Sequence, residues 1–325
     1  MIQIGEYETF YGQRKSLVAQ VGDGSIIHRF DKTPVPREPE DIVCPHFLEL
    51  KWALGCPFNC AWCYLQGTLR LYPRRKAPTY RLAVTEENPY AEVERALREL
   101  FRLTYPSEPE VLNAGELADS LMAERSPFPF TRFAVPLFEA QDRHRLLLLT
   151  KASWVEHLVG MGPHRQTIVS FSLNAEPVAQ RWEKAPPVRD RIEAAALVAR
   201  VGYEVRIRVD PIVPYPEDDW LSDYLRLLDE VFAHLIPSRI TLGSLRGLQS
   251  TINAASDRSW VEYLTEQSPW GRRMPEDKRL GAFSGVKEYL ESRYGYTHVA
   301  LCKEPIKVWE ALGLDWRNCR CNCVV

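Results

Sequence analysis

The chain has 325 residues, with 41 Lys and Arg, 43 Asp and Glu, and 8 Cys. A chain this long buries roughly three-quarters of its unfolded surface and needs no disulfide, and no apolar run reaches the ~18 residues of a membrane span. Its net charge of −2 gives no strong electrostatic argument for nucleic acid. The polar start, MIQIGEYETF, does not fit a signal peptide. We therefore expect a cytoplasmic protein, with no membrane partner, in which clustered cysteines are metal ligands.

The pattern up to residue 46 predicts short strands and loops, ending in the Pro-rich connection 33–41. From residue 47, strand and helix patterns alternate. Strands are predicted over 47–53, 110–114, 145–150, 167–173, 204–209 and 239–242, and helices over 90–103, 188–201 and 220–235. Gly202 stands where a helix C-cap is expected. The later chain is less regular, with a last strand near 298–301 and a helix near 305–312.

Six strand-then-helix units predict a parallel sheet with right-handed crossovers. The expected fold class is therefore α/β, a partial (β/α)6 TIM-like barrel with extensions at both ends. We assign an N-terminal extension to 1–46, the barrel to 47–250, and a C-terminal region with a Cys-rich tail to 251–325.

Three cysteines lie in one tight loop after the first barrel strand. Cys56, Cys60 and Cys63 have the spacing CxxxCxxC, and such loops meet at the active-site face of a barrel. Three thiolates can hold three irons of a [4Fe–4S] cluster and leave the fourth open for a reactant. A zinc site, to which Cys44 or His46 could contribute, and three buried cysteines are the alternatives.

This loop resembles the signature of the radical S-adenosylmethionine (radical SAM) enzymes, in which an aromatic residue, here Trp62, precedes the third cysteine. The resemblance implies a [4Fe–4S] cluster and SAM as cofactors, and reductive cleavage of SAM to a 5′-deoxyadenosyl radical that abstracts hydrogen from a substrate. It also implies an external electron donor of the flavodoxin or ferredoxin type. Trp62 and residues at other predicted strand ends then become the cofactor-binding candidates; the latter are Gly115, Glu116, Lys151, Ser172, Asn174 and Arg208.

A closer resemblance is to the spore photoproduct lyase-like family. The run CYLQ at 63–66 and the stretches 149–151, 171–175, 191–195 and 202–203 carry it, so it covers about residues 50–215. It implies abstraction of hydrogen from a thymine dimer in DNA, and a role for Tyr64 in hydrogen return. The family's hydrogen-donating cysteine aligns with Glu116, and a carboxylate cannot replace a thiol in that step.

Two further segments bear on the substrate. Basic residues Arg70, Arg74, Arg75, Lys76 and Arg81 alternate with Tyr72 and Tyr80, a composition that suits phosphates and unstacked bases. The tail carries Cys319, Cys321 and Cys323, whose alternate spacing places three thiolates on one face of an extended chain, as a second thiolate site. Similar cysteine-rich tails occur in radical SAM enzymes that handle thiophilic species.

The leading hypothesis is therefore a radical SAM enzyme of the spore photoproduct lyase-like family. Its substrate is DNA or a small molecule, the latter including a thiophilic species bound by the tail cysteines. A non-catalytic metal-binding or nucleic-acid-binding module is the alternative from another class.

Overall fold

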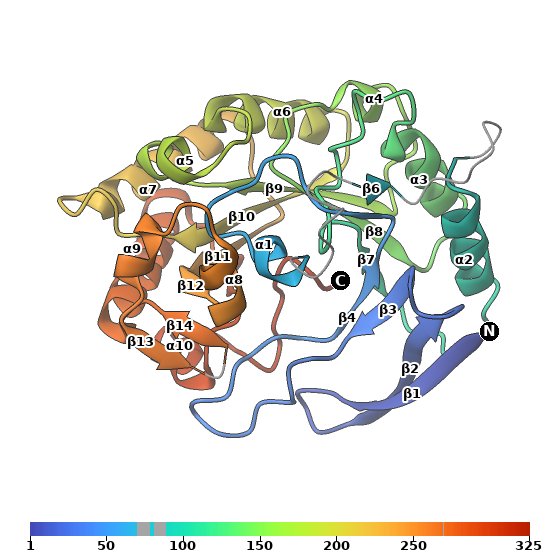
Figure 1. The fold of residues 1–325 in the computed structure, drawn as a ribbon, viewed down its shortest axis with the longest axis horizontal. Coiled ribbons are helices and arrows are strands. Elements are labelled where there is room, and N and C mark those ends of the chain that lie inside the picture. Colours follow the sequence, from blue (N-terminus) through green and yellow to red (C-terminus); the bar gives the residue numbers. More distant parts are fainter. Residues whose placement is uncertain (70–78, 81–88, 269) are drawn as a thin grey trace.

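The computed structural model describes residues 1–69, 79–80, 89–268 and 270–325, and its centre is a curved ten-stranded sheet (Figure 1). The order is β1-β2-β3-β4-β7-β8-β9-β10-β11-β15. The pairs from β1 to β4 are antiparallel, and all pairs from β4 to β15 are parallel. The strands of this sheet are β1 (Ile2–Glu8), β2 (Arg14–Val21), β3 (Ile27–Phe30), β4 (Phe47–Leu50), β7 (Val111–Asn113), β8 (Arg145–Thr150), β9 (Thr167–Leu173), β10 (Glu204–Ile212), β11 (Arg239–Ser244) and β15 (Val299–Leu301).

Most of the helices cover the outer face of the parallel strands in Figure 1. The helices are α1 (Leu65–Thr68), α2 (Ala91–Phe101), α3 (Phe130–Glu139), α4 (Glu156–Val159), α5 (Glu176–Trp182), α6 (Val188–Arg200), α7 (Trp220–His234), α8 (Gln249–Ala254), α9 (Glu276–Tyr294) and α10 (Ile306–Ala311), with a 3-10 turn at Ser259–Tyr263. Of these, α1 lies inside the ring of strands, in contact with α8. Short strands form two small sheets: β5 (Ala53–Leu54) with β6 (Thr79–Tyr80), and β12 (Arg246–Gly247), β13 (Glu266–Ser268) and β14 (Gly271–Arg273).

The predicted barrel elements agree with the observed ones, with two kinds of difference. β8 and β9 have the predicted bounds, and Gly202 has the expected positive φ of 105° after α6. The strand predicted over 47–53 is wrong in its second half, because the backbone leaves the sheet after Leu50. There the Lys51 N–H donates to the Ile26 carbonyl and the Trp52 N–H to that of Leu50. Helices α3 and α9 were not predicted.

The N-terminal connection closes the seam beyond β15. The Val43 N–H donates to the Glu304 carbonyl (3.0 Å), and the Ile306 N–H donates to the Asp41 carbonyl (3.0 Å). Glu304 itself is buried, and its carboxylate accepts hydrogen bonds from Ser244 (2.5 Å) and the buried Arg279. Residues 41–43 therefore join the two ends of the parallel wall.

The tail enters the barrel, and Figure 1 shows the C-terminus at its centre. The Arg206 guanidinium donates to the carbonyls of Asn322 and Val324 (both 2.7 Å), and that of Arg239 donates to the Cys321 carbonyl (3.0 Å). The tail therefore fills the barrel floor that the inward side chains of β10 and β11 leave open.

Among the described residues, no helix is long and apolar enough to cross a membrane. The division into segments 1–46, 47–250 and 251–325 stays a prediction; β1 to β3 of the first segment extend the sheet of the second.

Candidate active site

A cavity of about 400 Å³ opens at the carboxyl ends of the parallel strands. Its wall takes residues from the loop after β4, the ends of β7 to β11 and the segment after β15. Predicted site residues that line it are Cys56, Cys60, Trp62, Cys63, Tyr64, Gly115, Glu116, Lys151, Ser172, Arg208, Cys321 and Cys323. The structure thus brings predicted residues from six chain segments to one cavity, in the volume range of small-molecule sites.

The cysteine loop has a rigid backbone. The Gln66 side-chain amide donates to the carbonyls of Cys60 (2.7 Å) and Ala61 (3.2 Å), and the Ala61 N–H donates to the Trp182 carbonyl (2.9 Å). Trp62 is buried against Trp182, with 5.7 Å between their ring centroids. These contacts fix the loop so that its three cysteines face the cavity.

The three loop cysteines are free thiols, and burial raises the pKa of each, that of Cys60 to about 12. In the described part of the chain, no three His, Cys, Asp or Glu side chains are arranged to hold a single metal ion. A [4Fe–4S] cluster makes a different demand, because each thiolate binds its own iron at a separate corner. Three soft donors on a preformed loop at a cavity suit such a cluster.

Acidic groups lie near the loop. The Tyr64 hydroxyl donates to the Glu116 carbonyl. Burial is the main cause that raises the pKa of Cys63, and the nearby Glu116 carboxylate raises it further. Asp119 is buried below them, and its carboxylate accepts from the Thr150 hydroxyl (2.7 Å) and the Lys151 N–H (2.7 Å). Two carboxylates beside the loop suit the ammonium group of an amino acid.

Gly115 has a packing role in addition to the predicted close approach of a ligand. A Cβ there would lie 2.6 Å from the Leu149 Cβ and 2.7 Å from the Leu149 carbonyl oxygen. The Gly115 N–H donates to the Asn113 side chain (2.9 Å), which fixes the turn after β7.

Lys151 is held by a buried carboxylate. Its ammonium lies 2.5 Å from Glu183, whose second oxygen accepts from Arg191 (2.7 Å). Although burial alone would raise it, Lys151 and Arg191 hold the pKa of Glu183 below its usual value. Glu183, which the sequence analysis did not select, therefore positions the Lys151 ammonium at the cavity wall.

Asn174 is the predicted SAM-binding residue that the structure does not bring to the cavity. It is fully buried, its Nδ2 donates to the Pro211 carbonyl (2.9 Å), and its Oδ1 accepts from Tyr224 (2.9 Å) and Ala175 (2.9 Å). The hydrogen-bonding groups of its side-chain amide are thus engaged within the fold. Its role in binding SAM stays a prediction, and these hydrogen bonds argue against it.

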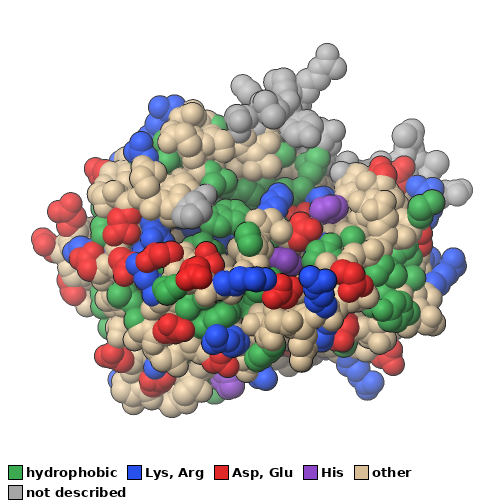
Figure 2. Space-filling view, turned by 90° about the horizontal axis from the view of Figure 1, so that it is seen from below, with side chains coloured by type: hydrophobic (Ala, Val, Ile, Leu, Met, Phe, Trp, Pro, Cys, Tyr) green, Lys and Arg blue, Asp and Glu red, His purple; other side chains and the backbone are tan. Residues whose placement is uncertain are grey.

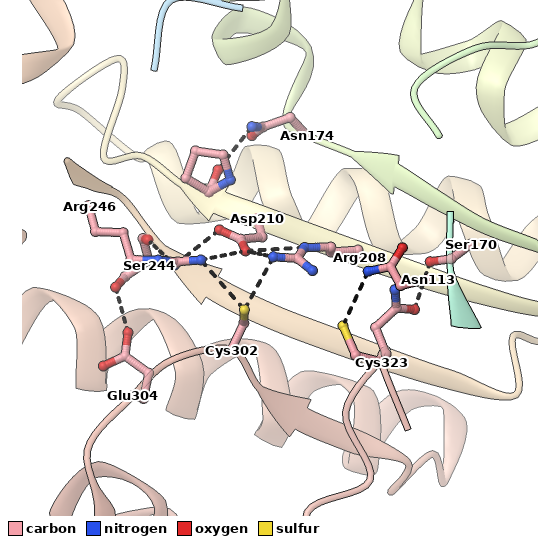
Figure 3. Close-up of polar contacts among 12 residues, drawn as sticks. Asn113, Ser170, Asn174, Arg208, Asp210, Ser244, Arg246, Cys302, Glu304 and Cys323 are labelled. Atoms are coloured by element: carbon pink, nitrogen blue, oxygen red, sulfur yellow. Dashed lines mark hydrogen bonds and ion pairs between the residues drawn. The ribbon is translucent and has the colours of Figure 1, made fainter. Parts of the chain in front are cut away.

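Arg208 belongs to a closed ring of contacts with three residues, shown in Figure 3. Asp210 accepts from Arg208 (2.5 Å) and Arg246 (2.9 Å), and both guanidiniums also reach the Cys302 sulfur, at 3.2 and 3.5 Å. Burial alone would raise the pKa of Asp210, but the two guanidiniums hold this pKa far below its usual value. Cys302 stays without a role in the sequence-based prediction, although the stretch 301–304 resembles the family's ending, and Arg246 is a lone residue with no motif around it.

Comparisons with known proteins agree with this geometry. A family profile described as spore photoproduct lyase matches residues 48–243. The chain belongs to the spore photoproduct lyase family. Members are radical SAM enzymes that use a [4Fe–4S] cluster and SAM, so the predicted family is confirmed.

Two curated members of the family are similar in sequence. The chain is 29% identical over 207 residues to the spore photoproduct lyase of Bacillus subtilis (strain 168), covering 57% of this chain and 51% of that protein. It is 28% identical over 188 residues to that of Geobacillus sp. (strain Y412MC61), covering 56% and 50%. The chain thus spans about half the length of the curated relatives it matches.

Solved structures of spore photoproduct lyase share the fold. A mutant bound to dinucleoside spore photoproduct has a TM-score of 0.61 at 19% identity, over 78% of this chain and 75% of that one. Another mutant, with bound AdoMet and dinucleoside spore photoproduct, has a TM-score of 0.60 at 20% identity, over 82% and 80%. The predicted partial TIM-like barrel is confirmed.

The tail of this family member contributes two of its three cysteines to the cavity. Cys321 and Cys323 line it, whereas Cys319 is partly exposed outside it. The Cys321 thiol is hydrogen-bonded to the thiols of Cys319 and Cys323. The Cys323 sulfur lies 4.0 Å from the Asn113 amide. The grouping of all three around one soft ion stays a prediction, since no arrangement for a metal ion exists among the described residues.

The predicted nucleic-acid segment lies largely outside the described residues. Arg70, Tyr72, Arg74, Arg75, Lys76 and Arg81 are in the gaps, and for Tyr80 only the backbone, in β6, is described. On the face seen in Figure 2, acidic and basic side chains are intermixed. The described part of that face thus has no continuous surface of positive charge to which DNA could bind.

Proposed function

We propose that the chain is a radical SAM enzyme in which Cys56, Cys60 and Cys63 hold the [4Fe–4S] cluster. The supporting observation is the single cavity that unites these three thiols with Glu116 and Lys151. The three sulfurs come from one loop, and the polar groups come from neighbouring strand ends.

When bound, the cluster supplies the electron that cleaves SAM to a 5′-deoxyadenosyl radical. The chain's own groups bind and orient SAM. Glu116 accepts from the ammonium, Lys151, fixed by Glu183, pairs the carboxylate, and the Ser172 hydroxyl bonds to the ribose. The Trp62 ring, packed on Trp182, keeps the loop side of the cavity dry.

The test is anaerobic reconstitution with iron and sulfide, followed by SAM and a chemical reductant. We expect 5′-deoxyadenosine, and its loss in Cys60→Ala. Cys319→Ser is the matched control, because that thiol lies outside the cavity. Unchanged 5′-deoxyadenosine formation in Cys60→Ala would refute the proposal. Replacing the chemical reductant by a flavodoxin or ferredoxin tests the predicted protein donor.

We further propose that the substrate is a thymine photoproduct, as the bound dinucleoside spore photoproduct of the related structures suggests. Tyr64 lines the cavity, where its hydroxyl donates to the Glu116 carbonyl. Glu116 stands where the family has a cysteine, although thiols of other segments line the same cavity. Turnover of dinucleoside spore photoproduct to thymidine, lost in Tyr64→Phe while SAM cleavage persists, is the expected result.

A small thiophilic substrate is the second candidate, favoured by the presence of Cys321 and Cys323 in the cavity wall. The test is titration of the reduced protein with arsenite, with free thiols counted after each addition. Loss of thiols that Cys321→Ser prevents and Cys319→Ser does not would support it. Equal loss in both variants would exclude it.

A further inference from the structure

The cavity is divided by charge. Its acidic groups Glu116, whose carbonyl accepts from Tyr64 of the cysteine loop, and Asp119, which accepts from the Lys151 N–H, line the side of the loop cysteines together with Lys151. Another part of the wall carries four cationic side chains, Lys32, Arg208, Arg246 and Lys303, and the carboxylate of Asp210, which pairs with the two arginines. Opposite charges at the two ends of one small cavity orient a ligand that carries both signs.

The two lysines at this wall have no acidic partner. Among the described residues, no carboxylate lies within 4.0 Å of the Lys32 or Lys303 ammonium. The other acid of the cavity wall, Glu49, is paired with Lys51 (3.0 Å). Burial raises the pKa of the Cys302 thiol although Arg208 opposes it, so this sulfur does not neutralise the wall.

Aromatic rings, not carboxylates, hold the lysine ammonium groups in place. The Lys303 ammonium lies 5.0 Å from the Phe30 ring centroid and 4.6 Å from that of Trp270, and the Lys32 ammonium lies 5.6 Å from Phe30. A cation over an aromatic face is positioned without losing its charge or its N–H donors. Lys303 also has a φ of 56°, a left-handed conformation that a lysine rarely adopts, and the preceding Cys302 N–H donates to the Leu242 carbonyl (2.7 Å).

We propose that Lys303, Lys32 and Arg246 form a subsite for an anionic group of the substrate, a phosphate or a carboxylate. Ammonium and guanidinium donors in the wall of one cavity suit such a group, because charge-assisted hydrogen bonds are the strong ones. The inference deepens the proposed function: it adds an anion to a substrate whose known form in the related structures is a dinucleoside.

The first experiment needs no knowledge of the substrate. The reconstituted protein with SAM is treated with an acylating reagent, with and without inorganic pyrophosphate, and each lysine is read by peptide mass spectrometry. We expect pyrophosphate to slow acylation of Lys303 severalfold and not that of Lys278, an exposed lysine of α9. Equal slowing at both lysines, or none, would overturn the subsite whether or not the protein cleaves SAM.

The second experiment identifies the source of the anion. Binding of dinucleoside spore photoproduct is compared with that of the same photoproduct carrying its bridging phosphodiester. One charge-assisted contact predicts about tenfold tighter binding of the phosphodiester form. The preference should be lost in Lys303→Met and kept in Lys303→Arg and Lys278→Met, with 5′-deoxyadenosine formation unchanged in Lys278→Met. Protection of Lys303 by pyrophosphate without binding of either photoproduct would keep the subsite, assign it to a small anionic molecule and refute the photoproduct substrate.

Discussion

Gly115 shows how a single residue combines packing with the site. A methyl group there would meet the Leu149 side chain and carbonyl at less than 3 Å. Gly115→Ala should therefore lower the free energy of unfolding by about 1–3 kcal/mol, the usual cost of overpacking. Urea denaturation checks this. Gly281→Ala in α9, with open space around the new methyl group, should instead gain about 0.5–1 kcal/mol. Equal effects at the two glycines would contradict the packing argument.

Glu124 gives the protein a pH-dependent stability. Burial, partly offset by hydrogen bonds from Thr131, raises the pKa of Glu124 from 4.5 to about 7. Because the folded pKa is raised, this carboxyl stabilises the fold below pH 4.5, and that contribution is lost as the pH rises toward 7. Relative to the wild type, Glu124→Gln should gain stability across this window, by up to about 3 kcal/mol. Unfolding measured from pH 4.5 to 7 tests it, with the exposed Glu92→Gln as control; a constant difference would refute it.

At the residue level, the motif-bearing part of the site could be predicted from the sequence, and the isolated residues could not. Cys56 and Glu116 are recognisable because a loop spacing or a strand end marks them. Cys302 and Arg246 follow strands late in the chain and gain meaning only when the barrel brings them to Asp210. Asn174 shows the opposite error: its place at a strand end suggested a ligand contact, but its amide is used inside the fold.

At the level of elements, periodicity predicted buried strands well and interrupted helices poorly. β9 is buried at every position, so its apolar run marks it clearly. α3 contains Pro136, and α9 contains Gly281 and Gly285, residues that ordinarily end or weaken a helix. Tertiary packing overrides that preference in α9, where Ala282, Val286 and Leu290 are buried against the core.

The tail is the element whose removal should be most costly. Without residues 319–325, the buried Arg206 loses the carbonyls of Asn322 and Val324 and keeps only Glu204. We expect a chain ended at Asn318 to lose about 3 kcal/mol or more, the usual cost of uncompensated polar burial. Removing Val325 alone, which is half exposed, is the control. Indistinguishable thermal unfolding of the two truncations would show that the tail is dispensable.

At the scale of the molecule, the seam between the N-terminal connection and β15 depends on Glu304. Its carboxylate neutralises the fully buried Arg279 and accepts from Ser244. Glu304→Gln should lower the free energy of unfolding by about 3 kcal/mol, because it leaves the buried Arg279 only the more distant carboxylates of Glu266 and Glu276, both at 3.6 Å. Glu40→Gln removes an exposed ion pair with Lys307 at the same seam and should cost less than about 1 kcal/mol. Equal denaturation midpoints for the two variants would refute the role of Glu304.

The inserted tail also has a consequence for how the protein is made. A ribosome synthesises the barrel wall first. Asn113 precedes Cys323, with which it is in contact, by 210 residues. Until residues 321–324 leave the ribosome, Arg206 and Arg239 face an unfilled interior. While these residues are missing, the nascent wall cannot reach its final packing. Such long sequence separations slow folding, and residues 321–324 set the moment at which the active-site cavity acquires its floor.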